Sequence, residues 1–253
     1  MDQNNPTLEA NAVLIKRSLS DEVYEFLYKR IIAGKYSSGE WLRQEDISSH
    51  LGVSQTPVRE ALDRLVTSGL AERVPYRGVR VPELAPKEII DAYALRLVLE
   101  TMAARLSVNI IQPDQINTLF TVVEQTKNLL TLEDMSTLRQ LNKEFHTRTV
   151  DTAGSPLLTK LYEMATNSFP DWMLYEYMFR HPELLQNSLQ REYQEHKAIV
   201  EALASRDPEA AIYQVSNHIK NLGKELETFL GISGDIIREV EHQIEPMLKN
   251  RLK

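Results

Sequence analysis

Apolar side chains recur at helical spacing near the start of the chain. In the stretch that begins at Ser20, four of them share one helical face: Val23, Phe26, Leu27 and Ile31. Gly34 is a natural stop for this helix. A short second helix is expected over about 44–51, and Gly52 ends it. These two helices are the first half of a compact predicted unit.

The third predicted helix has the most regular apolar face. It begins at Ser54 or Thr56, either of which is a suitable N-cap, and Pro57 falls in its first turn. Its apolar residues follow the i, i+3, i+4, i+7 spacing of a core-facing helix: Val58, Ala61, Leu62 and Leu65. Two short β-prone runs follow, at 70–74 and 79–81, and the sequence PYRG joins them in a hairpin. The order of elements predicts a winged helix-turn-helix.

The remainder of the chain has a helical pattern with no convincing strand. Proline and glycine mark the breaks, and the predicted helices are 86–109, 112–130, 133–151, 155–179, 181–204 and 207–230. Short connections predict antiparallel neighbours and therefore a bundle. The last stretch is predicted to be another amphipathic helix, interrupted at Pro246.

The predicted fold class is thus mainly α, with two folded parts. A winged helix-turn-helix with a small β-hairpin occupies 16–82, and an all-α antiparallel helical bundle occupies 83–232. Residues 1–15 are expected to be a flexible tail, and 233–253 a helical extension.

Charge differs between the two parts. The net charge is −7, yet residues 16–82 hold 11 Lys and Arg against 9 Asp and Glu, so this segment is mildly basic. A basic head on an acidic body suits a protein that touches DNA at one end only. The chain has no cysteine, which excludes disulfides and cysteine-ligated zinc. It shows neither a signal peptide nor an apolar run near the roughly 18 residues of a membrane span, so a cytoplasmic location is expected.

The exposed side of the third helix offers side chains that read DNA. In a helix-turn-helix the first turns of the second helix enter the major groove, where Arg recognises guanine and Gln recognises adenine. Gln55, Thr56 and Arg59 occupy those turns, while Arg43 and Arg77 flank the unit and suit phosphates. The alternative is an ordinary amphipathic helix with solvated charges.

Histidine spacing in the bundle suggests a metal site. Asn142 and His146 are four residues apart and share a helical face. His196 lies 11 residues before the Asp207 turn and His218 lies 11 after it, so in an antiparallel hairpin the two stand at about the same height. Three imidazoles and one amide oxygen suit a divalent ion, Zn²⁺ or Ni²⁺ above all. The alternative is buried histidines that only form hydrogen bonds.

The N-terminal unit resembles the winged helix-turn-helix of the GntR family of bacterial transcription regulators. The likeness covers Ser20 to Pro82, and VSQTPVREAL closely resembles that family's VSRTPVREAL. Thr56 and Arg59 match the family pattern. Gln55 stands where Arg is common, which implies a different operator preference. The resemblance implies a regulator that binds an inverted repeat of operator DNA as a homodimer.

The bundle is similar to the ligand-binding domain of the FadR-like, FCD-type subgroup of that family. The likeness rests on four features: LRLVLETMAARL, FH followed by AGSPLL, EHKAIVEALASRDPEAA and the later His218. Members commonly hold a divalent metal through an Asp and three His. His146, His196 and His218 match, and Asn142 occupies the Asp position. This exchange removes a negative charge and implies weaker metal binding.

The same resemblance points to a small organic-acid effector. Arg96 matches the family's Arg in an R-x-x-L-E pattern, and an inward-pointing Arg binds a carboxylate with two hydrogen bonds. The alternative is a structural ion pair with Glu100, one turn later. Tyr93, one turn earlier, is a second effector-binding candidate.

The expected function is a ligand-responsive regulator, not an enzyme. The competing hypothesis is a metal-dependent enzyme, since a histidine site with open positions can activate water. A general base beside the metal is then required, and Glu144 and Glu195, which adjoin the histidines in sequence, are expected to point elsewhere on their helices. A third alternative is a helical partner-binding module with a degenerate DNA head.

Overall fold

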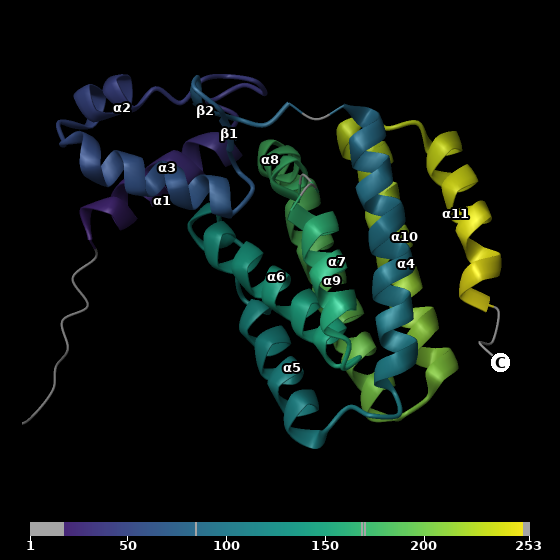
Figure 1. Cartoon of the computed structure of the whole chain (residues 1–253). Helices are drawn as coiled ribbons and strands as arrows, with labels where there is room; N and C mark the ends of the chain where they lie inside the picture. Colours follow the sequence, from purple (N-terminus) through teal and green to yellow (C-terminus); the bar gives the residue numbers. More distant parts are fainter. Residues whose placement is uncertain (1–17, 84, 168, 170, 250–253) are drawn as a thin grey trace, which may run out of the picture.

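The computed structural model of the protein describes residues 18–249 except 84, 168 and 170. The tail predicted over residues 1–15 lies outside the described residues. Figure 1 shows a small N-terminal unit at one end of a helical bundle. Within the described ranges, no helix has the length and apolar character needed to cross a bilayer.

The N-terminal unit is a winged helix-turn-helix, which confirms the predicted order of elements. It contains three helices and an antiparallel hairpin: α1 (Leu19–Ile32), α2 (Gln44–Leu51), α3 (Gln55–Thr67), β1 (Glu72–Val74) and β2 (Gly78–Arg80). Ser18 and Asp21 form a capping box at the start of α1. Gly52 ends α2 with a φ of 66°, a backbone conformation that glycine adopts without steric cost.

The two faces of α3 differ as the apolar spacing predicts. Its four periodic apolar residues are buried: Val58, Ala61, Leu62 and Leu65. The side chains of Gln55, Thr56 and Arg59 are exposed. Burial of one face anchors the helix to α1 and leaves the other face free for recognition.

The remaining helices form the bundle, which confirms the mainly α fold class. They are α4 (Pro86–Ser107), α5 (Pro113–Thr126), α6 (Met135–Asp151), α7 (Pro156–Asn167), α8 (Asp171–Arg180), α9 (Pro182–Ala204), α10 (Pro208–Leu230) and α11 (Gly234–Lys249), with a 3₁₀ turn, η1 (Leu132–Asp134), before α6. Helix α10 packs between α4 and α9, and α6 packs against α4, α5 and α7. Helix α11 lies on the outside, against α4 and α10.

Two helix predictions are wrong. The single helix expected over 155–179 is two helices, because α7 ends at Asn167 and α8 begins at Asp171. The sequence has Pro170 between them, and proline cannot continue a helix. Conversely, Pro246 does not interrupt α11. It lies in the last turn, where it removes one hydrogen bond, while the apolar face of α11 packs on the bundle and holds the helix together.

One hydrophobic core spans both parts of the molecule. The residues buried in the winged unit form a continuous cluster with six from the bundle: Met135, Leu138, Trp172, Tyr175, Met178 and Leu189. These residues come from α6, α8 and α9, and α8 packs directly on α1. At the end of α1, Gly34 has a φ of 62°, and a Cβ there would overlap the side chain of Arg180 on α8. The winged unit is therefore packed onto the bundle rather than attached by a linker alone.

We expect Trp172→Ala to lower the free energy of unfolding by about 3–5 kcal/mol. Trp172 is 2% exposed, and its indole fills the core that the two parts share. Urea unfolding followed by circular dichroism measures the change. Tyr213→Ala is the control, because Tyr213 is 63% exposed and its removal should change stability by less than about 0.5 kcal/mol. Equal stability of the two variants would contradict the shared core.

Candidate functional site

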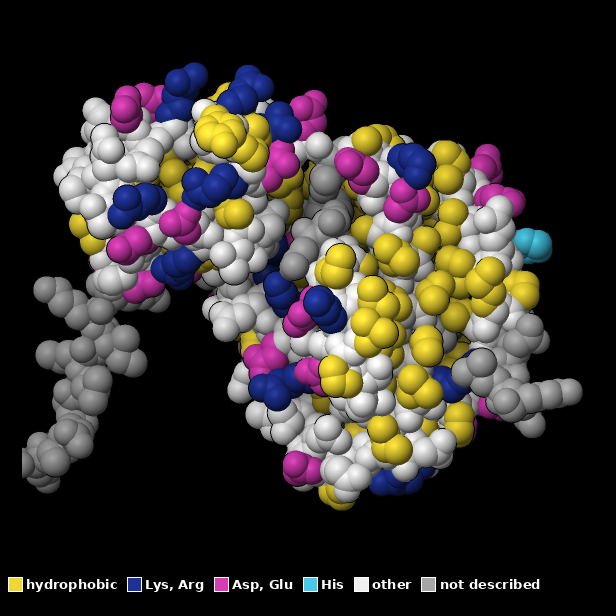
Figure 2. Space-filling view, in the orientation of Figure 1, with side chains coloured by type: hydrophobic (Ala, Val, Ile, Leu, Met, Phe, Trp, Pro, Cys, Tyr) yellow, Lys and Arg dark blue, Asp and Glu magenta, His cyan; other side chains and the backbone are white. Residues whose placement is uncertain are grey.

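A hollow on the winged unit gathers four of the five predicted DNA-contacting residues. Arg43, Gln55, Arg59 and Arg77 line it together. Thr56 is outside the lining but is exposed in the first turn of α3. Figure 2 shows dark blue Lys and Arg side chains clustered on this unit. Side chains from the start of α2, from α3 and from the wing therefore form one surface.

Neighbouring side chains hold this surface in shape. The guanidinium of Arg77 lies over the Trp41 ring, 5.2 Å from its centroid. Gln44 donates from Nε2 to the carbonyl and side-chain oxygens of Gln55, both at 3.2 Å. Trp41 and Gln44 were not predicted as part of the site. They contribute by positioning Arg77 and Gln55, a role that leaves no periodic signal in the sequence.

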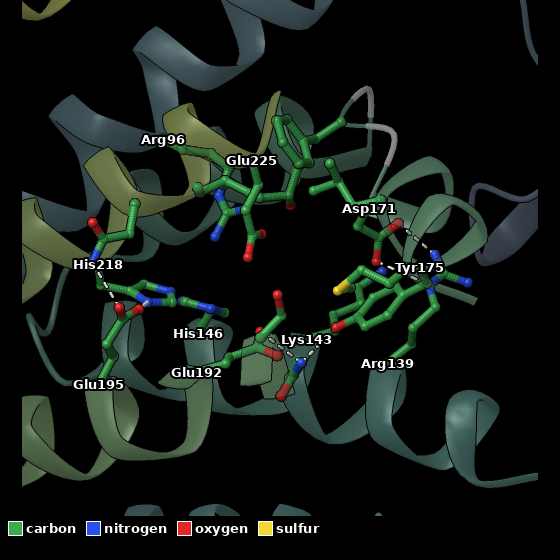
Figure 3. A pocket seen from close by; sticks show the side chains of 18 of the residues that line it. Arg96, Arg139, Lys143, His146, Asp171, Tyr175, Glu192, Glu195, His218 and Glu225 are labelled. Atoms are coloured by element: carbon green, nitrogen blue, oxygen red, sulfur yellow. Dashed lines mark hydrogen bonds and ion pairs between the residues drawn. The ribbon is translucent and has the colours of Figure 1, made fainter. Parts of the chain in front are cut away.

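The bundle contains an internal cavity of about 120 Å³, shown in Figure 3. Side chains from α4, α6, α8, α9 and α10 line it, and the wall includes Ser68 and Gly69 at the end of α3. Charged groups dominate the lining: Arg96, Arg139, Lys143, Asp171, Arg191, Glu192, Glu195 and Glu225. The cavity thus reaches from the centre of the bundle to the winged unit.

Three histidines converge beside this cavity, as their spacing predicts. His146 comes from α6, His196 from α9 and His218 from α10. Their ring centroids are 4.7–5.1 Å apart. One potential ligand nitrogen from each lies within 4.8 Å of the others, and all three residues are buried. This is a geometry that can hold a metal ion.

Two carboxylates fix the orientation of two of the imidazoles. Glu100 lies 2.8 Å from Nδ1 of His146, and Glu195 lies 2.7 Å from Nδ1 of His218. A carboxylate that accepts from Nδ1 leaves Nε2 as the free lone pair, the arrangement found around protein metal ions. The expectation that Glu195 points elsewhere is wrong, since the turn of α9 brings it against α10. Glu144 does point away and pairs with Arg148 at 2.7 Å.

The third histidine has a nitrogen that lacks a partner. His196 is 1% exposed, and its ring stacks on Phe145 with centroids 4.1 Å apart. Its Nε2 atom has no hydrogen-bond partner within the part of the chain that the structure describes. A buried polar atom without a partner is costly, and a metal ion bound at Nε2 would supply that partner. The residues present therefore fit a divalent metal.

Asn142 lies one turn before His146 and lines the same cavity. Its amide nitrogen donates to the hydroxyl of Tyr175 at 2.7 Å and to the carboxylate of Glu192 at 2.9 Å. Those two hydrogen bonds use the nitrogen and leave the amide oxygen as the atom that a metal would take. Tyr175 and Glu192 were not predicted as site residues.

The two predicted effector-binding residues have different surroundings. Arg96 is buried, lines the cavity, and donates from Nε to Glu100 at 2.8 Å. The ion pair weighed as an alternative is therefore present, and the guanidinium still faces the cavity (Figure 3). Tyr93 does not line the cavity. Its hydroxyl donates to Glu241 on α11 at 2.5 Å, because the extra helix covers it.

Arg139 links the cavity to the recognition helix, and sequence reasoning missed it. It donates to both carboxylate oxygens of Asp171, at 2.9 and 2.6 Å. Its Nη2 also lies 3.3 Å from the carbonyl oxygen of Ser68, the residue that caps α3. The spacing of Arg139, Asn142 and His146 places all three on one face of α6, a signal visible in the sequence.

Burial shifts the pKa values of the histidines and of the acids in opposite directions, and in both cases it favours the neutral form. Burial lowers the pKa of His146 to about 4 and holds the pKa of His196 well below its ordinary value, so both are neutral near pH 7. The pKa of Glu192 is raised by burial, and burial together with the charge of Glu192 raises the pKa of Glu225 to about 7. Neutral imidazoles are the form that metals bind.

Two family models account for both parts of the chain. The model described as bacterial regulatory proteins, gntR family, matches residues 19–81, and the FCD domain model matches residues 91–221. The chain belongs to the GntR family, in the group that carries an FCD domain. This GntR-family member is therefore a DNA-binding transcriptional regulator with a C-terminal effector-binding domain.

Individual relatives agree with this assignment. The regulator is 27% identical over 219 residues to a probable D-xylose utilization operon transcriptional repressor of Paenarthrobacter nicotinovorans, covering 81% of this chain and 88% of that protein. It is 26% identical to the regulator McbR of Escherichia coli, over 76% of this chain and 85% of that one. The solved structure of E. coli McbR/YncC has the same fold, with a TM-score of 0.57 and 22% identity over 85% of this chain and all of that chain.

The buried histidines of this regulator predict a pH-dependent stability. The unfolded chain protonates an imidazole near pH 6.5, while folded His146 resists protonation down to about pH 4. Stability from this group is thus complete above pH 6.5 and is lost as the pH falls toward 4. We expect the stability advantage of wild type over His146→Gln to shrink by about 2–3 kcal/mol between pH 7 and pH 4.5.

Urea unfolding in the presence of a chelator, at several pH values, measures this difference. The raised pKa values of Glu192 and Glu225 act in the opposite direction, but both proteins share them, so the comparison cancels them. His242→Gln is the control, because His242 is exposed on α11 and its variant should follow wild type. A constant difference between wild type and His146→Gln would show that His146 is not held neutral.

Proposed function

We propose that this regulator binds an inverted-repeat operator as a homodimer and responds to a small carboxylate effector held in the FCD cavity. Residues 16–82 read DNA and residues 83–232 sense the effector. The observation that carries the proposal is the cavity itself, which has histidines and Arg96 on its inner wall and the end of α3 on its outer wall. A ligand there touches both the sensor and the recognition helix. The protein acts in the cytoplasm, where bacterial DNA lies.

The proposed DNA contacts divide into two kinds. Gln55, Thr56 and Arg59 enter the major groove and read bases, because they are exposed in the first turns of α3. Arg43 and Arg77 take phosphates from either side of the same hollow. In the described interactions neither Arg43 nor Arg59 has an ion-pair partner, which leaves both guanidinium groups available. Arg73 is less available, since it pairs with Asp63.

We expect Arg59→Ala to weaken operator binding by about 10-fold or more and to relax the choice among operator variants. An Arg that reads guanine contributes to selectivity, so unrelated DNA should be affected less. Gel shift on the native promoter and on scrambled DNA measures both effects. Arg77→Ala should weaken both DNAs about evenly. Arg148→Ala, on the bundle, is the charge-matched control, and full operator affinity in Arg59→Ala would disprove the role of Arg59.

We propose that His146, His196 and His218 hold a divalent metal, Zn²⁺ or Ni²⁺, with the amide oxygen of Asn142 as a weak fourth ligand. The geometry of the three imidazoles and the unpartnered Nε2 of His196 support this. A bound divalent ion supplies positive charge and open positions for an oxygen ligand. The domain is proposed not to be an enzyme, because Glu100 and Glu195, the carboxylates beside the imidazoles, are used as hydrogen-bond acceptors.

The effector's carboxylate is proposed to face Arg96, which is buried and lines the cavity. A ligand that fills the cavity changes the environment of Arg139, one of the groups on its wall. Because Arg139 also contacts the carbonyl of Ser68, any shift of α6 reaches the end of α3. Regulation then requires that the effector binds one arrangement of the two units better than the other.

An apolar face on the bundle supports dimer formation. Helices α4 and α7 pack together and expose five large apolar side chains: Leu95, Met102, Leu157, Leu161 and Met164. Their exposed fractions range from 42% to 67%, and Figure 2 shows hydrophobic side chains gathered over these helices. A contiguous apolar patch on a protein of this kind marks an interface. We propose a second copy as its occupant, because one recognition helix reads too few bases for adequate specificity.

We expect the double variant Leu161→Lys with Met164→Lys to be a monomer of half the wild-type mass. Two lysines on the apolar face would have to lose water in the dimer without gaining a partner charge. Light scattering after size-exclusion chromatography measures the mass, and gel shift should show weaker operator binding. Tyr213→Lys is the control for an exposed apolar residue outside the face. An unchanged mass in the double variant would place the interface elsewhere.

A further inference from the structure

The FCD cavity is lined by several acidic groups, and the described ion pairs do not give each of them its own cation. Two of its arginines are already paired: Arg96 with Glu100 and Arg139 with Asp171. Three other lining carboxylates remain, those of Glu192, Glu195 and Glu225. Two of them share Arg191, whose side chain is 47% exposed at the rim, and the described ion pairs give Glu192 no cation at all. Lys143 also lines the cavity, but its side chain is exposed and it appears in none of these pairs.

Glu192 is the acid in this lining that has no positively charged partner among the described ion pairs. It lies on α9, one turn before His196, and accepts a hydrogen bond from the Asn142 amide at 2.9 Å. A carboxylate taken from water without an opposite charge is strongly destabilised. Glu225 enters from α10, and Figure 3 shows it beside Arg96 and across the cavity from Glu192. Two acids therefore face the cavity, and the described ion pairs give them only Arg191, which pairs with Glu225.

A metal at the histidines does not account for Glu192. The group of described side chains whose ligand atoms lie within 4.8 Å of one another contains His146, His196 and His218 and does not include this glutamate. Glu192 is thus available to the contents of the cavity. The carboxylate of Glu192 favours a positively charged hydrogen-bond donor as its partner. An ammonium group is such a donor, and it offers up to three hydrogen bonds to carboxylate oxygens.

Building on the proposed function, we propose that the effector is a small amino acid or a similar zwitterion. Its carboxylate faces Arg96 and the histidine end of the cavity, and its ammonium group lies between Glu192 and Glu225. The cavity volume of about 120 Å³ suits a small ligand. A plain dicarboxylate leaves the acidic wall without a partner and adds like charge to it.

The test compares acids with their amino counterparts on the full-length, Zn²⁺-loaded protein. The pairs are propionate with alanine, butyrate with γ-aminobutyrate, and succinate with aspartate. Isothermal titration calorimetry should show at least one amino compound binding about 10-fold or more tightly than its plain acid. Glu192→Gln and Glu225→Gln keep the side-chain shape and should each remove most of that preference. Binding of the plain acids should be unchanged or tighter in both variants.

Glu201→Gln is the matched control, because Glu201 is exposed on the same helix α9 and away from the cavity. It should leave the preference intact. Thermal unfolding of each variant checks that all remain folded. Zn²⁺ affinity, measured by chelator competition, should be the same in Glu192→Gln as in wild type.

Three results overturn the inference, and they differ in what else they affect. If plain acids bind as tightly as their amino partners, the inference fails and the proposed carboxylate effector stands. If Glu192→Gln lowers Zn²⁺ affinity, Glu192 serves the metal site, as a ligand or through its hydrogen bond with Asn142, rather than accepting an ammonium group. If no compound of either kind binds, the inference and the carboxylate effector fail together, while operator binding is still judged separately by gel shift.

Discussion

The ion pair between Arg139 and Asp171 is the interaction on which the arrangement of the molecule depends. Arg139 is buried and Asp171 is partly exposed, both line the cavity, and the same guanidinium contacts the carbonyl of Ser68 at the end of the recognition helix. Arg139 also lies against the ring of Tyr28 from α1, at 5.8 Å. Loss of Asp171 would leave the buried guanidinium of Arg139 without its partner charge, which is unfavourable. Arg139 therefore contacts residues of α1 and α8 and the end of α3 from its position on α6, and adds a polar link to the core that these helices share.

Helix α6 connects this ion pair to the residues that line the cavity. Arg139, Asn142 and His146 lie at positions i, i+3 and i+7 on the inner face of α6. Arg139 contacts the end of α3, Asn142 donates to Glu192, and His146 belongs to the group of three histidines. Small displacements of a packed helix are transmitted along its length because close-packed interiors do not deform continuously. The lining of the cavity and the end of the recognition helix are thus in contact through one helix.

The sequence was sufficient for most of the elements and for the convergence of the histidines, because both follow from helical period and turn position, but it did not predict the break between α7 and α8 or the continuation of α11 through Pro246. Equal distances of His196 and His218 from the Asp207 turn place their rings 4.7 Å apart in the hairpin. Sequence reasoning failed where the answer depends on which helix lies opposite. Glu195 was expected to point away from the histidines, and the partner of Tyr93 proved to be Glu241, 148 residues later. The acids of the cavity carry no local signal at all, since Glu192 and Glu225 look like surface charges until α9 and α10 are packed.

The core shared by the two parts also sets an order of events during synthesis. The winged unit leaves the ribosome first, and N-terminal units ordinarily fold as soon as they emerge. Here its apolar face lacks Met135, Leu138 and Trp172 until at least 90 further residues beyond Pro82 have been made. The DNA-reading head therefore completes its packing only after α8 arrives. The buried side of the winged unit is therefore complete only after a large part of the bundle has been made.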